Sequence, residues 1–226
     1  MDEMNMYDVT AQIAPSLAVD EIENDHMYVL GVAQDRSGTM GPYDSDMNGA
    51  MQNFVESVQG SKSDDEMLVS VTTFNSTVSS TGFQNVADLD TTYWSGGCTA
   101  LYDAIIVAAK QVIDYVDQLN ASGVRTRGGL VIYSDGKDNV SQNDAAAAAK
   151  MIAELIRREI MVAFVAFGQD AHGIAKSLGV EPHNVLETDA TPSELRRVWG
   201  IISKSAVSAS KSAAAGSSQV GFFDVT

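Results

Sequence analysis

Short hydrophobic runs alternate with amphipathic segments along most of the chain. The runs are rich in β-branched residues, as buried strands are, and they lie at residues 27–33, 67–74, 129–134 and 160–167. Between and after them, apolar side chains recur at helical spacing, which predicts helices at residues 46–58, 101–119, 144–158, 171–178 and 191–205. Strands that alternate with helices form a parallel sheet covered on both faces. The pattern predicts a three-layer α/β/α, Rossmann-like doubly wound domain over residues 26–206.

A weaker alternation follows the second predicted strand. Its apolar members, within residues 77–88, are Val78, Phe83 and Val86. This spacing predicts an antiparallel hairpin at one edge. The sheet is therefore expected to be mostly parallel, with one antiparallel edge strand.

The two ends of the chain break the pattern. Residues 1–25 carry repeated Asp and Glu around an apolar patch at residues 13–19, which indicates an acidic N-terminal arm that this patch could dock. Residues 207–226 are rich in Ala and Ser, and we expect a low-complexity tail that buries too little apolar area to become ordered. The tail ends near Phe222 and Phe223, which form either a docking peptide or a terminus without function.

Composition narrows the classes of function. The chain has 226 residues with 14 Lys and Arg against 30 Asp and Glu, a formal net charge of −16, which disfavours nucleic acid and anionic membranes as partners. One cysteine, Cys98, allows no intrachain disulfide, and we expect its side chain to be buried and structural. The sequence starts without the features of a secretory signal and contains no membrane-spanning run. These features predict a cytoplasmic protein.

Polar side chains follow the predicted strands at three separate places. One group comes directly after the first strand, a second residue follows a Ser-Gly-Gly-Cys segment, and a third follows the strand at 129–134. Because the carboxyl ends of parallel strands meet at one edge of a sheet, we expect these side chains to converge. All are hard oxygen donors, which suit Mg²⁺, with Mn²⁺ and Ca²⁺ as alternatives. The predicted ligands are Asp35, Ser37, Thr39, Thr99 and Asp135.

Each of these residues also has an ordinary structural interpretation. Asp35 and Ser37 could form an Asx turn, Thr99 could cap the helix that follows it, and Asp135 with Gly136 is a common turn dipeptide. Their joint placement on three loops is what favours a single metal site. Two carboxylates would offset most of the ion's charge, while neutral hydroxyls would leave it able to bind one more anionic oxygen.

The three segments resemble the von Willebrand factor A domain and its metal ion-dependent adhesion site, whose pattern is Asp-x-Ser-x-Ser, then Thr, then Asp. They occur in the family's order as Asp35-Arg36-Ser37-Gly38-Thr39, Gly96-Gly97-Cys98-Thr99 and Ser134-Asp135-Gly136. The resemblance covers residues 26–206 and is closest to small intracellular bacterial and phage-borne members. Thr39 stands where the family usually has Ser, which keeps the hydroxyl and adds a methyl group.

This resemblance implies a role for each ligand and a class of function. Ser37 and Thr39 would bind the ion directly, Thr99 and Asp135 would alternate between direct and water-mediated contact, and Asp35 would anchor coordinating water. The implied function is a non-enzymatic protein-interaction module whose partner supplies an Asp or Glu carboxylate. Related domains serve in bacterial or phage assembly or work beside an AAA-type ATPase. Arg36 is placed either to steer an acidic partner or to point into solvent.

Two other functions remain open at this stage. A Mg²⁺-dependent phosphoester hydrolase would use the ion to activate water, but it needs a general base that we do not find in the sequence. Ser37 occupies the place where a haloacid-dehalogenase-like phosphatase has its second aspartate. The other alternative is an assembly or scaffold subunit that binds its partners without metal.

Overall fold

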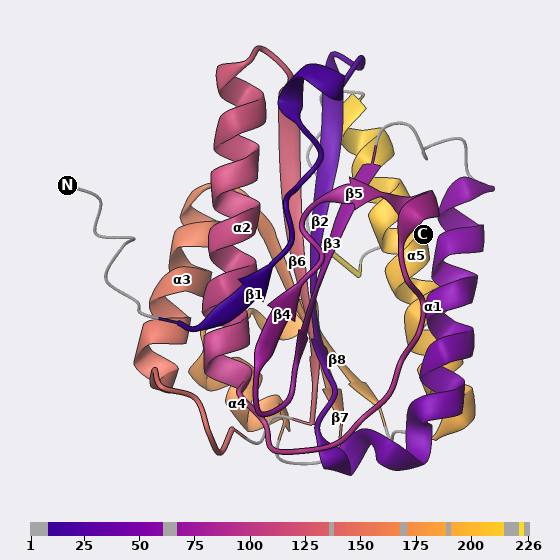
Figure 1. The fold of residues 1–226 in the computed structure, drawn as a ribbon, viewed down its shortest axis with the longest axis vertical. Helices are drawn as coiled ribbons and strands as arrows, with labels where there is room; N and C mark the ends of the chain where they lie inside the picture. The colour runs from indigo at the N-terminus through magenta and orange to yellow at the C-terminus, as the bar shows by residue number, and fades with distance from the viewer. Residues whose placement is uncertain are drawn as a thin grey trace.

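The computed structural model describes residues 9–60, 67–135, 138–167, 171–188, 191–214 and 222–223. One eight-stranded sheet runs through the middle of this structure (Figure 1). In chain order its strands are β1 (Ala11–Ile13), β2 (His26–Asp35), β3 (Met67–Phe74), β4 (Val78–Ser80), β5 (Gln84–Asn85), β6 (Arg125–Ser134), β7 (Met161–Phe167) and β8 (Val185–Thr188).

The sheet is mostly parallel, as predicted. The strand order is β1-β4-β3-β2-β6-β7-β8, with β5 beside β3, and β2 pairs in parallel with both β3 and β6. Strands β4 and β5 are antiparallel to β3. The antiparallel strand β4 is not outermost, because β1 pairs with it in parallel on its outer side. The central strand β2 is buried from Met27 to Asp35, since helices cover both faces.

Helices cover the two faces of the sheet in separate layers (Figure 1). One face packs against α2 (Leu101–Ala121), α3 (Ala145–Arg157) and α4 (Ala171–Ser177), and the other against α1 (Asp44–Gln59) and α5 (Pro192–Ala214). All five helices were predicted. Short 3₁₀ segments complete the chain: η2 (Val19–Glu21), η3 (Gly38–Tyr43), η5 (Val86–Asp88) and η6 (Pro182–Asn184). No described helix combines the length and apolar character that crossing a bilayer requires.

Strand β8 and the start of β6 were not predicted because they lack an apolar run, and the three-residue strand β1 was not predicted either. Strand β8 has four residues, Val-Leu-Glu-Thr, and is held by backbone pairing with β7. Strand β6 begins at Arg125 and not at the predicted residue 129. Its first three residues, Arg-Thr-Arg, are polar and only partly covered, so the apolar pattern did not include them. Their backbone groups nevertheless pair with β2.

The described part of the predicted acidic arm lies against the domain. Strand β1 forms an edge of the sheet, and the side chains of Leu17 and Val19 pack against the core. The backbone N–H of Leu17 donates to the carbonyl of Phe83 at 2.7 Å, and the hydroxyl of Tyr115 donates to the carbonyl of Leu17 at 3.0 Å. The apolar patch therefore docks the arm, while residues 1–8 lie outside the described residues.

The prediction that the chain loses order from residue 207 is wrong for two segments. Helix α5 continues to Ala214, because the small side chains of Ala206, Ala209 and Ser210 are buried and allow close packing. Phe222 is fully buried in the core cluster that contains α1 and α5, and its backbone N–H donates to Oδ1 of Asn184 at 2.8 Å. Residues 215–221 and 224–226 lie outside the described residues.

The buried aromatic ring of Phe222 should contribute measurably to stability. We expect Phe222→Ala to lower the free energy of unfolding by about 3 kcal/mol, because it removes a fully buried aromatic side chain. Phe223, which is only partly buried and packs edge-on against Phe222 with ring centroids 5.2 Å apart, is the matched control. Urea unfolding of the two variants would contradict this docking if both lost the same small amount.

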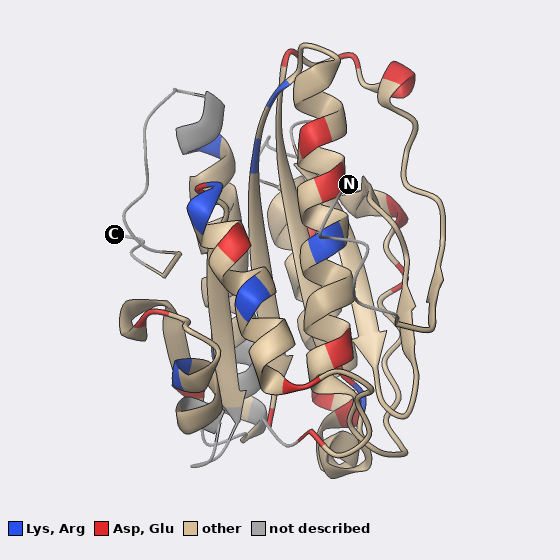
Figure 2. Ribbon diagram, turned by 90° about the vertical axis from the view of Figure 1, so that its left-hand side faces the viewer, with Lys and Arg blue, Asp and Glu red and all other residues tan. Residues whose placement is uncertain are grey.

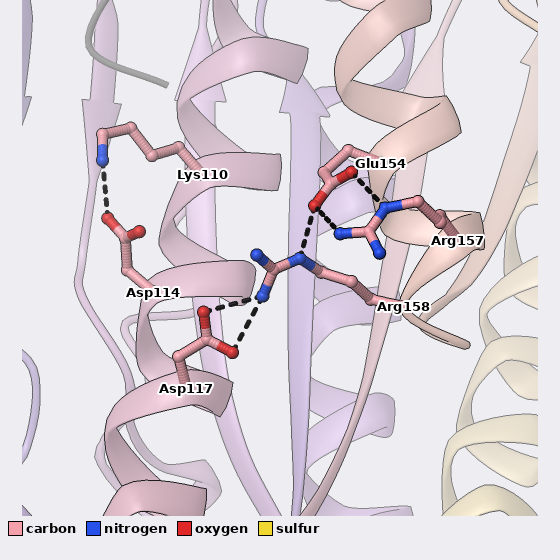
Figure 3. Close-up of polar contacts among 6 residues, drawn as sticks. All are labelled: Lys110, Asp114, Asp117, Glu154, Arg157 and Arg158. Atoms are coloured by element: carbon pink, nitrogen blue, oxygen red, sulfur yellow. Dashed lines mark hydrogen bonds and ion pairs between the residues drawn. The ribbon is translucent and has the colours of Figure 1, made fainter. Parts of the chain in front are cut away.

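Charged residues are spread over the helices and loops, with Asp and Glu prominent (Figure 2). One ion-pair network joins α3 to α2 (Figure 3). Arg158, just after α3, donates from Nη1 to both carboxylate oxygens of Asp117 at 2.8 and 2.7 Å and from Nε to Glu154 at 2.6 Å. Arg157 forms two further bonds to Glu154, at 2.7 and 2.6 Å. Hydrogen bonds from Arg157 and then Arg158 lower the pKa of Glu154 to about 2.

This network should make stability depend on acid pH. Because the pKa of Glu154 falls from 4.5 to about 2 on folding, its stabilisation is present above pH 4.5 and is lost as the pH falls toward 2. Glu154→Gln should therefore cost stability at pH 7, by less than about 1 kcal/mol because the pair is partly solvated. The difference from wild type should vanish near pH 2. A difference that stays constant with pH in chemical unfolding would contradict this assignment.

Candidate metal centre

The five predicted ligands come from three loops at one end of the sheet, the lower end in Figure 1. Strands β2 and β6 both end there, and helices α1 and α2 both begin there. The first loop carries Asp35, Ser37 and Thr39, the second carries Thr99, and the third carries Asp135. Their positions follow from parallel strands that end side by side.

Asp35 is fully buried and bonded on both oxygens. Its Oδ1 accepts a hydrogen bond from the backbone N–H of Ser37 at 2.8 Å, so the Asx turn considered for this loop does form. Its Oδ2 accepts from the hydroxyl of Ser134 at 2.6 Å, and its backbone carbonyl accepts from the hydroxyl of Tyr93. Burial raises the pKa of Asp35, against the lowering effect of the hydrogen bonds from Ser134 and Ser37.

Hydrogen bonds between side-chain oxygens join the first loop to the third. Ser37 Oγ lies 3.0 Å from Thr39 Oγ1, which donates to Oδ2 of Asp135 at 2.6 Å. Thr39 and Asp135 are 96 positions apart in the sequence. Four of the five predicted ligands, including Asp35 through its bond with Ser37, thus form one continuous cluster.

The loop that carries Thr99 is bonded to both of the others. The N–H of Gly38 donates to the carbonyl of Gly97 at 3.0 Å, which ties this loop to the first. The N–H of Thr99 donates to Oδ1 of Asn139 at 2.9 Å, and the N–H of Asn139 returns a bond to the carbonyl of Thr99 at 3.0 Å. Helix α2 begins after Ala100 without a side-chain cap, so the interpretation of Thr99 as a cap is wrong.

Glycine is required where the second loop turns. Gly97 has a φ of 86°, and a Cβ there would lie 2.8 Å from Oγ of Ser76. The same Ser76 Oγ accepts the backbone N–H of Cys98 at 3.0 Å. This surface turn leaves the side chain of Cys98 exposed, so the prediction of a buried cysteine is wrong.

Arg36 lies against the neighbouring loop rather than pointing into solvent. Its Nη2 donates to the carbonyl of Thr92 at 2.7 Å, and its guanidinium carbon lies 5.5 Å from the centre of the Tyr93 ring. Burial lowers the pKa of Arg36, although the arginine keeps its charge at ordinary pH. Its guanidinium therefore braces the loop beside the site.

Sequence reasoning missed the residues that hold the ligands in place. Ser134, Tyr93 and Asn139 bond to Asp35 or Thr99 across 40 to 99 positions of sequence. Ser134 and Asn139 lie within the third loop's motif region, which is the one local signal available. The contacts that give them this role appear only once the chain is folded.

The donor set fits a hard divalent cation. Among the described residues no group of three or more His, Cys, Asp or Glu is placed to hold a metal ion. The cluster at this site has two carboxylates, and its other side-chain donors are hydroxyls. Mg²⁺, Mn²⁺ and Ca²⁺ prefer such oxygen ligands. The buried carboxylate of Asp35 also carries a cost in its charged form, which a neighbouring cation would reduce.

Comparisons with known proteins give a likeness in structure alone. No protein-family model and no curated protein matches the sequence. The pilus adhesin SpaC from Lactobacillus rhamnosus GG superposes with a TM-score of 0.64 and 11% identity, over 82% of this chain and 30% of that chain. Proximal thread matrix protein 1 from the mussel byssus, whose metal ion-dependent adhesion site (MIDAS) motif is occupied by zinc, superposes with a TM-score of 0.55 and 13% identity. The match covers 81% of this chain and 47% of that chain.

A third solved structure that is similar to this chain is loaded with manganese. Manganese-loaded TRAP protein of Plasmodium vivax superposes with a TM-score of 0.52 and 18% identity, over 77% of this chain and 72% of that chain. These likenesses show that the fold is of the von Willebrand factor A type, as predicted. The chain spans under a third of the SpaC chain and about half of the byssus protein.

Direct metal titration would test the five ligands. We expect isothermal calorimetry to detect Mg²⁺ and Mn²⁺ binding to metal-stripped protein, and Asp135→Asn to weaken it by about tenfold or more. Asp90→Asn is the matched control, because Asp90 is an exposed carboxylate on a nearby loop that accepts hydrogen bonds from Thr92 and lies outside the oxygen cluster. Equal affinity in all three proteins would exclude the site.

Proposed function

We propose that this chain is a metal-dependent protein-binding module. Asp35, Ser37, Thr39, Thr99 and Asp135 would hold one divalent cation, for which Mg²⁺ is our first choice, and a partner's Asp or Glu carboxylate would complete its coordination. The observation that carries this proposal is the cluster of two carboxylates and two hydroxyls from two loops, joined by the 2.6 Å bond from Thr39 to Asp135, with the loop of Thr99 bonded to both.

The exposure of these residues supports access from one side. Asp35, Ser37 and Thr99 are buried, whereas Thr39 is exposed and Asp135 is half-buried. A partner would therefore reach the ion past Thr39 and Asp135. The two carboxylates would offset most of the ion's charge, while the neutral hydroxyls would leave it able to accept an external carboxylate as a further ligand.

The nature of the structural neighbours favours binding over catalysis. They include a pilus adhesin and a matrix protein, and one neighbour has a MIDAS motif occupied by zinc. Three described polar residues that bond to predicted ligands, Ser134, Tyr93 and Asn139, are engaged in holding the loops. We therefore assign them to positioning and not to proton transfer.

Capture experiments with the immobilised chain would test this function. Proteins from an extract of the source cells should be retained in the presence of Mg²⁺ and released by a chelator. Asp135→Asn should lose this retention, and Asp90→Asn should keep it, because only Asp135 lies in the oxygen cluster.

Two results would contradict the proposal. Retention that survives both the chelator and Asp135→Asn would favour a metal-independent scaffold. Turnover of a phosphoester that disappears in Asp135→Asn would favour the hydrolase.

A further inference from the structure

Exposed hydrophobic side chains occur on the loops that carry the candidate metal site. Among the described residues the large hydrophobic side chains with most exposure are Ile13 at 54%, Trp94 at 54%, Ile156 at 43% and Val140 at 42%. Trp94 lies on the loop that leads to Thr99, and Val140 lies on the loop that follows Asp135. Ile13 is on the edge strand β1 and Ile156 is near the end of α3, away from these loops.

The loop that carries Trp94 is fixed to the body of the domain. Asn48, on α1, bonds the backbone of Tyr93 in both directions, at 2.9 Å to its carbonyl and at 2.8 Å from its N–H. The hydroxyl of Tyr93 donates to the carbonyl of Asp35. Tyr93 is therefore buried and held, which places the next residue, Trp94, at a defined position beside the first ligand loop.

The ring of Trp94 also has a partner beneath it. The guanidinium carbon of Arg36 lies 5.6 Å from the centre of the Trp94 ring and 5.5 Å from that of Tyr93. Arg36 itself is anchored by its bond to the carbonyl of Thr92 at 2.7 Å. A cation over an aromatic ring stabilises it in place, so an indole that is half exposed is nevertheless ordered before any partner arrives.

Val140 is presented by a loop that is held on both sides. Before it, Asn139 exchanges two bonds with Thr99, at 2.9 and 3.0 Å. After it, the carboxylate of Asp103 accepts the N–H groups of Gln142 at 2.8 Å and Asn143 at 3.1 Å. The exposure of Val140 therefore results from a fixed loop conformation, as does that of Trp94.

We infer that Trp94 and Val140 form an apolar contact surface for the partner beside the metal-bound carboxylate. This inference rests on the proposed function and names the chemistry of the partner: a protein segment in which an Asp or Glu is flanked by apolar side chains. Trp is one of the residue types enriched at the energetic hot spots of interfaces. Apolar contacts on both loops would also exclude water and so strengthen the bond between ion and carboxylate.

The negative charge of the chain further restricts which partner segments can bind. The chain has a formal net charge of −16, and Figure 2 shows Asp and Glu on several segments around the lower end, where the site lies. Additional acidic residues in the partner would be repelled. The preferred segment therefore has one acidic residue, apolar neighbours, and otherwise neutral or basic side chains.

A display selection with random peptides would test this partner chemistry. A phage library of random 12-residue peptides would be bound to the immobilised wild-type chain in Mg²⁺ and eluted with a chelator, which recovers only metal-dependent binders. We expect the recovered sequences to share one Asp or Glu with apolar residues within a few positions of it. Replacing that acidic residue with its amide in the synthetic consensus peptide should abolish binding.

Matched variants would then assign the apolar preference to the two side chains. Trp94→Ala should lower the affinity for the consensus peptide about tenfold. Ile13→Ala, which replaces a side chain of equal exposure, should leave this affinity unchanged. Val140→Ala should lower the affinity for the peptide by a smaller factor, with Ile156→Ala as its control. All four variants should bind Mg²⁺ as the wild type does, which would show that the site is intact.

The possible results separate the two proposals. Recovery of acidic peptides without apolar neighbours, or equal peptide affinity in Trp94→Ala and Ile13→Ala, would overturn the apolar surface and leave the metal-dependent module standing. Failure to recover any peptide by chelator elution would contradict the proposed function and this inference with it.

Discussion

The buried carboxylate of Asp35 is the group on which the candidate site depends. Burying a charge is costly unless hydrogen bonds compensate for it. Here the compensation comes from the N–H of Ser37 and the hydroxyl of Ser134, and Tyr93 bonds the carbonyl of the same residue. These contacts join the ends of β2 and β6 and the loop before α2. The hydrogen bonds to the carboxylate and the carbonyl of this one residue therefore fix three separate segments relative to one another.

The fold could be predicted from sequence wherever burial left a periodic signal. The central strands are covered on both faces, so they appear as continuous apolar runs, and the helices show an apolar stripe. The prediction failed for segments that are held in the fold by backbone pairing or by the packing of small side chains. Strand β8 is held by pairing with β7, and the Ala- and Ser-rich end of α5 packs because its residues are small. Neither arrangement requires a hydrophobic pattern.

The candidate ligands could be predicted because each follows a strand and carries a hard oxygen donor. What surrounds them could not be predicted, for a different reason in each case. Asn139 and Tyr93 act through partners that are distant in sequence. Cys98 was expected to be buried from residue type alone, but it is exposed on a loop in which its backbone N–H bonds to Ser76. Residue types were enough to predict the chemical groups at the site. Its geometry depends on contacts between residues that are far apart in the sequence.

The two tryptophans of the chain occupy opposite environments, and this has an optical consequence. Trp199 is 1% exposed and lies 5.8 Å from Phe54 and 5.5 Å from Tyr133, measured between ring centres. Trp94 is 54% exposed. Indole fluorescence shifts with the polarity around the ring, so the blue part of the emission reports on the core and the red part on the surface beside the ligand loops. A single spectrum can thus distinguish loss of the fold from a change at the site.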